Sequence, residues 1–195
     1  MRRDGFVQLL SWASSTRVPV IVGNGLLARE IYRWHDSSNL LYLFGGMGLA
    51  SSVAAGLIAG GAIDSTREVV VLEGDGNFLM GLQGAAMCAR LSAPVLHVVD
   101  VNGVYATTGG QELPSHLSSP ADICRLGRAL GYRQAHIAKT AFDIESAISN
   151  FQLTRSGILV ALDFGAGSER NERPPLSQSQ AVVRFMKALN SGFAG

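Results

Sequence analysis

The sequence predicts an α/β protein built on a doubly wound, mostly parallel β-sheet with helices on both faces. Its strand candidates are apolar along their whole length, which is typical of strands that are covered on both sides. They alternate with helical segments of roughly 10 to 15 residues, the pattern of βαβ units. A chain of 195 residues can bury one core of this kind, so we expect a single domain over residues 1–195.

The first half of the chain opens with a helix. Residues 4–14 carry apolar side chains at helical spacing, and 17–25 (RVPVIVGNG) is a short buried strand that ends in an Asn-Gly turn. Residues 26–35 have apolar positions for one helix face, and 40–46 form an apolar run stopped by glycines. Residues 49–63 form a helix of small side chains, which can pack its backbone closely against a neighbour.

The second half continues the alternation. Residues 68–76 (EVVVLEGDG) and 93–103 (APVLHVVDVNG) are apolar strands, and 78–91 is the helix that connects them. Residues 157–165 form one more continuous apolar strand, and 179–190 one more helix. The ends of the strands, where function lies in this fold class, are where the unusual residues fall.

Composition narrows the class of protein. Hydrophobic residues make up 47% and charged residues 16%, so we expect another subunit to cover part of the surface. The net charge is +1, and the Lys and Arg residues are spread along the chain without a basic stripe, which argues against nucleic-acid binding. No apolar run approaches the ~18 residues of a membrane span, so we expect no membrane association and a cytoplasmic location. Cys88 and Cys124 lack CxxC spacing and are expected to be buried structural thiols.

Three predicted strands finish in turns rich in glycine and carboxamide side chains: VGNG at 22–25, EGDGN at 73–77 and DVNG at 100–103. In a parallel sheet these turns share one edge. Gly74 and Gly76 allow close approach of the backbone to a ligand, and a helix that begins near Asn77 would point its free N–H groups there. This arrangement suits an anion such as phosphate.

Asp75 would repel a phosphate unless a cation lay between them. Asn102 follows Gly76 after 25 intervening residues, about enough for one helix and one strand, so Asp75 and Asn102 should end neighbouring strands. Carboxylate and amide oxygens suit Mg²⁺ or Ca²⁺, with phosphate and water completing the shell. Asp-Gly and Asn-Gly are also common turn dipeptides, and it is the pairing at this spacing that favours a metal site.

These motifs resemble the signature of thiamine-diphosphate enzymes, in which a GDG triplet is followed at a similar distance by a pair of asparagines. The segments FGGMGLASSVAAGLIAG, GDGNFLMGLQGAA, VNGVYATTGGQ and GSERNERPPLSQSQAVVRFM are similar to the diphosphate-binding domain of sulfopyruvate and phosphonopyruvate decarboxylases. The resemblance therefore covers essentially the whole chain. One departure is Val101, which stands where the first Asn of the pair is usual.

The resemblance implies that the chain binds thiamine diphosphate with Mg²⁺. Asp75 and Asn102 would bind the ion through their side chains, and Val104 through its backbone carbonyl. Met47 would be the apolar wedge beneath the cofactor rings, and the Gly45 carbonyl would accept a hydrogen bond from the aminopyrimidine. The implied cofactor contacts are Asn24, Gly25, Gly45, Gly46, Met47, Gly74, Asp75, Gly76, Asn77, Asn102, Val104 and Tyr105.

The resemblance also implies an incomplete active site. In these enzymes the activating glutamate lies on a second, pyrimidine-binding domain, for which this chain has no room. No catalytic residue is therefore expected here, and an α-type partner should supply it. The chain would be the β-type subunit of a 2-oxo acid decarboxylase in a hetero-oligomer such as α2β2, with the residues that choose the substrate largely on the partner.

Other functions stay open at this point. The chain could belong to a carboligase that forms an acyloin, or it could be a non-catalytic structural or regulatory subunit. A flavodoxin-like mononucleotide binder is a further alternative, although GNGLLARE after the first strand is poor in the residues of a phosphate loop. The roles of Glu73, His116, Arg170 and Arg173 are not assigned by the sequence.

Overall fold

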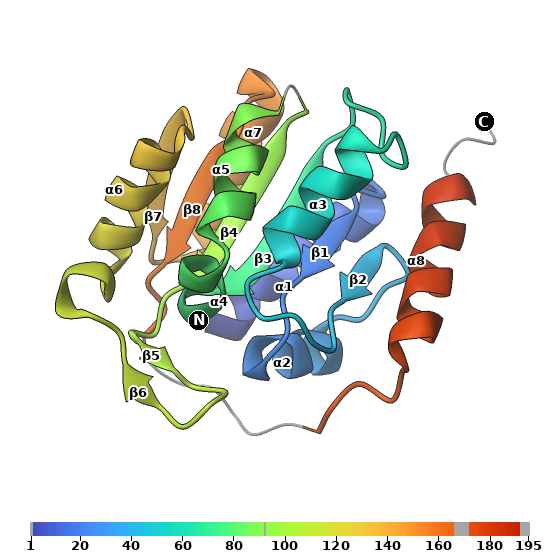
Figure 1. Ribbon diagram of the computed structural model, residues 1–195. Coiled ribbons are helices and arrows are strands. Elements are labelled where there is room, and N and C mark those ends of the chain that lie inside the picture. Colours follow the sequence, from blue (N-terminus) through green and yellow to red (C-terminus); the bar gives the residue numbers. More distant parts are fainter. Residues whose placement is uncertain (1, 92, 166–171, 192–195) are drawn as a thin grey trace.

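A computed structural model describes residues 2–91, 93–165 and 172–191. Its centre is a six-stranded sheet in which every pairing is parallel, with strand order β2-β1-β3-β4-β8-β7 (Figure 1). The strands are β1 (Val20–Val22), β2 (Leu40–Tyr42), β3 (Val69–Gly74), β4 (Val95–Asp100), β7 (Gln134–Ala138) and β8 (Ile158–Leu162). A separate antiparallel pair, β5 (Val104–Tyr105) and β6 (Gln111–Glu112), follows β4.

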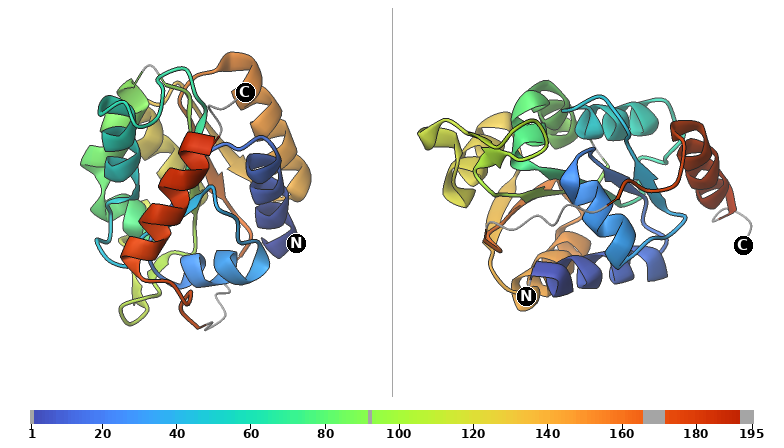
Figure 2. Two further views of the ribbon diagram at one scale, coloured as in Figure 1. Left: turned by 90° about the vertical axis from the view of Figure 1, so that its right-hand side faces the viewer. Right: turned by 90° about the horizontal axis from the view of Figure 1, so that it is seen from below.

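Helices cover both faces of this sheet. They are α1 (Arg2–Ser15), α2 (Leu26–Trp34), α3 (Ala50–Ala59), α4 (Asp75–Met80), α5 (Leu82–Arg90), α6 (Pro120–Leu130), α7 (Ala141–Thr154) and α8 (Gln178–Ser191), with a 3₁₀ turn at Ser115–Leu117. Helices α3, α5 and α6 lie on one face and α1 and α7 on the other, while α8 runs beside the edge strand β2 (Figure 2). The prediction of a doubly wound α/β fold is confirmed.

The apolar strands have the burial that their composition predicts. Val69 and Val71 of β3 pack into the core beneath α3 and α5, whereas Val70 and Leu72 pack into the core beneath α1 and α7. Every residue of β1, β2, β4 and β8 is buried. Because each of these strands meets helices on both faces, alternate polar residues would have no solvent to face. Within the described residues, no helix is both long and apolar enough to cross a bilayer.

The order in which the chain adds strands to the sheet reverses between β1 and β3. From β1 the chain passes through α2 to β2 on one side, and it then returns through α3 to β3 on the other side of β1. Ligands of open α/β sheets bind outside the carboxyl ends of the strands at such a switch point. The turns after β1 and β3 meet at this point, and the turn after β4 lies next to them.

The structure differs from the sequence prediction in two stretches. The helix expected over 78–91 is two helices. The first, α4, begins at Asp75, earlier than the Asn77 expected, and the helix is interrupted at Gly81, which packs against the backbone of Gly48. The stretch between 120 and 154, for which no element was predicted, contains α6, β7 and α7. Its two helices begin with capping boxes, Ser119 with Asp122 and Thr140 with Asp143, a local signal that was present in the sequence.

Candidate cofactor site

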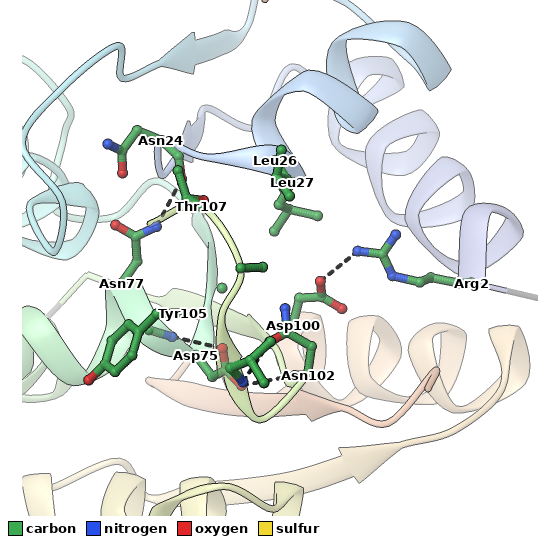
Figure 3. Close-up of a pocket in the computed structure, with 14 residues that line it drawn as sticks. Arg2, Asn24, Leu26, Leu27, Asp75, Asn77, Asp100, Asn102, Tyr105 and Thr107 are labelled. Atoms are coloured by element: carbon green, nitrogen blue, oxygen red, sulfur yellow. Dashed lines mark hydrogen bonds and ion pairs between the residues drawn. The ribbon is translucent and has the colours of Figure 1, made fainter. Parts of the chain in front are cut away.

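A pocket with about 440 Å³ of open space lies at the carboxyl ends of the strands, at the switch point (Figure 3). It is lined by Arg2, Asn24, Leu26, Leu27, Gly74, Asp75, Gly76, Asn77, Asp100, Asn102, Val104, Tyr105, Ala106 and Thr107. Eight of the twelve cofactor contacts expected from the sequence line this pocket, from Asn24 to Tyr105. Gly25 lines an adjoining cavity, and Gly45, Gly46 and Met47 line neither.

Asp75 is the centre of the pocket. Its Oδ1 accepts a hydrogen bond from the backbone N–H of Gly76 at 2.8 Å, and its Oδ2 accepts from the N–H groups of Asn102 at 2.8 Å and Gly103 at 2.7 Å. The side chain is 1% exposed, and these three hydrogen bonds hold it in one position. Burial raises the pKa of Asp75, and the Asp100 charge raises it further, while the three backbone donors lower it. The carboxylate has hydrogen-bond partners, but no cationic side chain among the described residues pairs with it, and a divalent cation would supply the missing counter-ion.

Asn102 follows the neighbouring strand. Gly74 pairs with Asp100 in the β3–β4 register, so Asp75 and Asn102 follow the ends of neighbouring strands, as the spacing predicted, and the Asn102 N–H reaches the Asp75 Oδ2. The Asn102 Oδ1 accepts a hydrogen bond from the Val104 N–H at 2.9 Å, which fixes the loop that carries the Val104 carbonyl. Within the described residues, no three His, Cys, Asp or Glu side chains gather as metal ligands. The oxygen donors of this pocket suit a hard cation that shares its shell with phosphate.

The two glycines of the GDG triplet serve different purposes. A Cβ at Gly76 would lie 2.8 Å from the Tyr105 ring, so a side chain there would displace that ring. At Gly74 the nearest atom to a Cβ would be the Asp100 carbonyl oxygen at 4.0 Å, and its backbone (φ −77°) is open to any residue. Nothing in the fold demands glycine at 74, but a side chain would occupy the pocket. This open position fits a bound diphosphate.

Asn77 connects the pocket to the loop that contains the predicted wedge. Its Oδ1 accepts from the Gly48 N–H at 2.9 Å, and its Nδ2 donates to the Asn24 carbonyl at 2.8 Å. One side chain therefore holds the turn after β1 and the GGMG segment against the start of α4. Met47 itself is half-buried and does not reach the pocket.

An ionic cluster that the sequence did not reveal closes one side of the pocket. Arg2 donates to the Glu30 Oε2 at 2.8 Å and to the Asp100 Oδ2 at 2.7 Å, as Figure 3 shows for Asp100. Burial raises the pKa of Asp100, and the Arg2 charge opposes that shift. The sequence offered a sign of Asp100's place in the pocket, because an acidic residue at the end of an apolar strand is unusual. Arg2 lies 98 positions away along the chain, and the sequence offered no sign of its place.

Glu73, which the sequence left without a role, lies outside the pocket in the core. Its Oε1 is 2.9 Å from the Nε2 of His97, whose Nδ1 is 2.6 Å from the Tyr132 hydroxyl. All three side chains are buried. The expected burial of both cysteines is also confirmed. Of the remaining unassigned residues, His116 is exposed, Arg173 lines the adjoining cavity, and Arg170 is outside the described residues.

The pocket thus holds a buried carboxylate and an amide at the switch point of a parallel sheet, where α/β proteins bind their cofactors. Residues 18–162 match the family described as thiamine pyrophosphate enzyme, C-terminal TPP binding domain, and the chain belongs to this family. The resemblance inferred from the motifs is thereby confirmed. Members of this family bind thiamine diphosphate through this domain.

Individual relatives narrow the comparison. The chain is 33% identical over 178 residues to a phosphonopyruvate decarboxylase from Streptomyces viridochromogenes. This match covers 90% of this chain and 43% of that protein. It is 31% identical over 175 residues to sulfopyruvate decarboxylase subunit beta from Methanococcus maripaludis. This match covers 87% of this chain and 88% of that subunit. The chain therefore spans less than half of the first relative and most of the second.

Among solved structures, benzoylformate decarboxylase from Polynucleobacter necessarius has a TM-score of 0.64 and 20% identity, over 87% of this chain and 33% of that one. At this identity the likeness is one of fold.

Proposed function

We propose that this chain is the diphosphate-binding subunit of a two-component, thiamine-diphosphate-dependent 2-oxo acid decarboxylase, with residues 1–195 as one diphosphate-binding domain. The observation that carries the proposal is Asp75, a buried carboxylate held by three backbone N–H groups beside Asn102, with no counter-ion in the part of the chain that the structure describes. The names of the relatives support the decarboxylase activity and the role as a subunit.

Each part of the pocket has a role in this proposal. The Asp75 carboxylate, the Asn102 amide oxygen and the Val104 carbonyl would hold Mg²⁺, and the backbone at Gly76 and Asn77 would lie against the diphosphate. Of these two residues, Asn77 would offer its N–H, because the Gly76 N–H donates to the Asp75 Oδ1. Gly45, Gly46 and Met47 would support the organic rings of the cofactor. When bound, thiamine diphosphate supplies the electron sink that allows a 2-oxo acid to lose CO₂. The chain's own contribution is to bind and orient this group.

A second polypeptide is part of the proposal. Within the described residues, no glutamate lines the pocket. Glu30 pairs with Arg2, and Glu73 pairs with His97 in the core. The glutamate that activates the cofactor would therefore come from a pyrimidine-binding partner, in a hetero-oligomer such as α2β2. Subunit beta in the name of the Methanococcus maripaludis relative supports this arrangement.

The experiment is to co-express the chain with a candidate partner and to measure CO₂ release from 2-oxo acids with and without Mg²⁺. We expect activity only in the complex and only with the metal. Asp75→Asn should lower activity by about 100-fold or more, because even changes behind a metal ligand cost about 10- to 100-fold. Asp64→Asn, at an exposed turn, is the matched control and should leave activity unchanged.

Two results would contradict the proposal. An isolated chain as active as the complex would exclude the divided site, and a fully active Asp75→Asn complex would favour a non-catalytic subunit. Mass spectrometry of the products from a single 2-oxo acid separates release of an aldehyde from formation of an acyloin, the carboligase alternative.

A further inference from the structure

A buried polar cluster lies in the core next to the cofactor pocket, and the proposed function does not use it. It consists of Glu73, His97 and Tyr132, which are 0%, 0% and 3% exposed. Glu73 directly precedes the GDG triplet on β3, and His97 lies on β4, the neighbouring strand at the centre of the sheet (Figure 1). The imidazole of His97 joins the other two side chains, with 2.9 Å from its Nε2 to the Glu73 Oε1 and 2.6 Å from its Nδ1 to the Tyr132 hydroxyl.

The hydrogen bonds of this cluster have a definite direction. Burial raises the pKa of Tyr132 well above its ordinary value, so the hydroxyl keeps its proton and can donate to Nδ1 of His97. A neutral imidazole then carries its own proton on Nε2, which donates to the Glu73 carboxylate. Both ring nitrogens are therefore used, and the imidazole is held between Tyr132 on one side and the end of β3 on the other.

Stability of the core does not by itself account for this cluster. The second carboxylate oxygen of Glu73, Oε2, is buried and has no hydrogen-bond partner among the described residues. Apolar side chains of similar volume can often replace a buried pair of ionisable groups with no loss of stability. The contacts that Glu73 and His97 make with the walls of the cofactor pocket indicate a different role.

His97 contacts both ends of the GDG turn (residues 74–76). Before the turn it bonds to Glu73, and after the turn its ring packs edge-on against Phe78 of α4, with the ring centres 5.3 Å apart. Phe78 is fully buried and directly follows Asn77, whose amide connects two neighbouring loops of the site. Asp75 lies between these two anchored ends.

The turn after β1 also lies against the cluster. A Cβ at Gly23 would be 2.8 Å from the Glu73 Cβ, so the backbone at the end of β1 touches this side chain directly. Gly23 precedes Asn24, which lines the cofactor pocket. One buried cluster therefore contacts three segments beside the pocket: the turn after β1, the end of β3 and α4.

We propose that Glu73 and His97 are positioning residues for the cofactor site, which fix both ends of the GDG turn and so hold the Asp75 carboxylate ready for the cation. Groups behind a metal ligand commonly set its orientation and thereby the affinity for the metal. Neither residue lines the pocket, and each acts through the backbone of the turn. The inference rests on the proposed function, because it takes Asp75 to bind a cation.

The test compares two replacements of Glu73 in the complex with the partner. Glu73→Leu removes the acceptor of the His97 hydrogen bond, whereas Glu73→Gln keeps an oxygen acceptor in nearly the same place. Calorimetry gives the Kd of Mg²⁺–thiamine diphosphate, and urea unfolding gives the stability. Ile148→Val is the matched control, because it removes one buried methylene group from the core on the other face of the sheet.

We expect Glu73→Leu to raise the Kd of the cofactor by about tenfold or more, the usual effect of a change behind a metal ligand. Glu73→Gln should recover most of the affinity. Ile148→Val should unfold at a lower urea concentration and bind the cofactor with unchanged Kd. If Glu73→Leu does not fold, it is combined with His97→Phe, which makes the whole pair apolar and keeps a ring against Phe78; the same rise in Kd is expected.

Three results would overturn the inference. An unchanged Kd in the apolar variant would show that the cluster serves only the core. An equal rise in Glu73→Gln would show that the hydrogen bond to His97 does not position the turn. An equal rise in Ile148→Val would show that any loss of core packing weakens the site.

These results are distinct from failure of the proposed function. The Kd can be measured whether or not a 2-oxo acid is decarboxylated, so a complex that shows the expected series of Kd values but releases no CO₂ would refute only the decarboxylase activity. A wild-type complex that binds the cofactor, with the same Kd in the apolar variant, would refute only the positioning role. A wild-type complex that does not bind Mg²⁺–thiamine diphosphate would refute both.

Discussion

Replacing Arg2 by glutamine tests the ionic cluster at the edge of the cofactor pocket. The guanidinium joins the carboxylates of Glu30 and Asp100 at 2.8 and 2.7 Å, and the three side chains are 14%, 1% and 5% exposed. It also lies 5.4 and 5.5 Å from the ring centres of Phe6 and Trp34. Glutamine keeps most of the packing and one donor group but removes the charge. Two buried carboxylates then lose their common counter-ion.

The expected cost follows from the protonation of a buried acid. Removing one partner of a buried ion pair typically costs about 3 to 5 kcal/mol. The carboxyl group can escape this cost by taking up a proton, which for an acid of ordinary pKa costs about 4 kcal/mol at pH 7 and about 1.5 kcal/mol at pH 5. We therefore expect Arg2→Gln to lose about 3 to 4 kcal/mol at pH 7.

The pH dependence has a definite sign. Burial already raises the pKa of Asp100 above its ordinary value, and loss of Arg2 removes the charge that opposes this shift. An acid with a raised pKa in the folded state binds its proton more tightly there than in the unfolded chain. The penalty is therefore absent below the ordinary pKa and grows as the pH rises through the folded value. The stability of the variant should approach that of the wild type as the pH falls from 7 to 5.

Urea unfolding at several pH values measures both effects. At an m-value of about 3 kcal/mol/M the midpoint should fall by about 1 M at pH 7 and by about half of that at pH 5. Arg3→Gln, at the exposed neighbouring position of α1, is the control and should stay within about 0.5 kcal/mol of the wild type. If Arg2→Gln and Arg3→Gln unfold at the same urea concentration at pH 7, the cluster does not stabilise the fold and the reasoning is wrong.

Three further substitutions or treatments test the pocket and the core. Gly74→Ala should leave stability within about 1 kcal/mol but weaken cofactor binding about tenfold or more, because its Cβ would enter the pocket; unchanged affinity would show that the space is not used. Gly76→Ala should cost about 1 to 3 kcal/mol in urea unfolding, since its Cβ would meet the Tyr105 ring at 2.8 Å. Burial raises the pKa of the Cys88 thiol to about 12 and raises that of Cys124, so iodoacetamide at pH 8 should label neither until the chain unfolds.

The sequence predicted much of the fold because its signals there are local. Continuous apolar runs mark β3, β4 and β8, which are buried on both faces. No strand was predicted at β7, an edge strand whose residues His136 and Ile137 are exposed. A half-exposed strand mixes polar and apolar residues and does not stand out as an apolar run. The break in the helix after β3 depended on contact with Gly48, which is distant in sequence.

By itself, the sequence determined that a carboxylate and an amide would meet at one edge of a parallel sheet. Asp75 and Asn102 each follow an apolar strand directly, and parallel strands bring their carboxyl ends together whatever the details of packing. Only the tertiary structure decided which charges lie beside that pair: Arg2 lines the same pocket, where it joins the carboxylates of Glu30 and Asp100. Electrostatic partners act across space between residues that lie far apart in the chain, so they leave no periodic pattern from which the sequence could predict them.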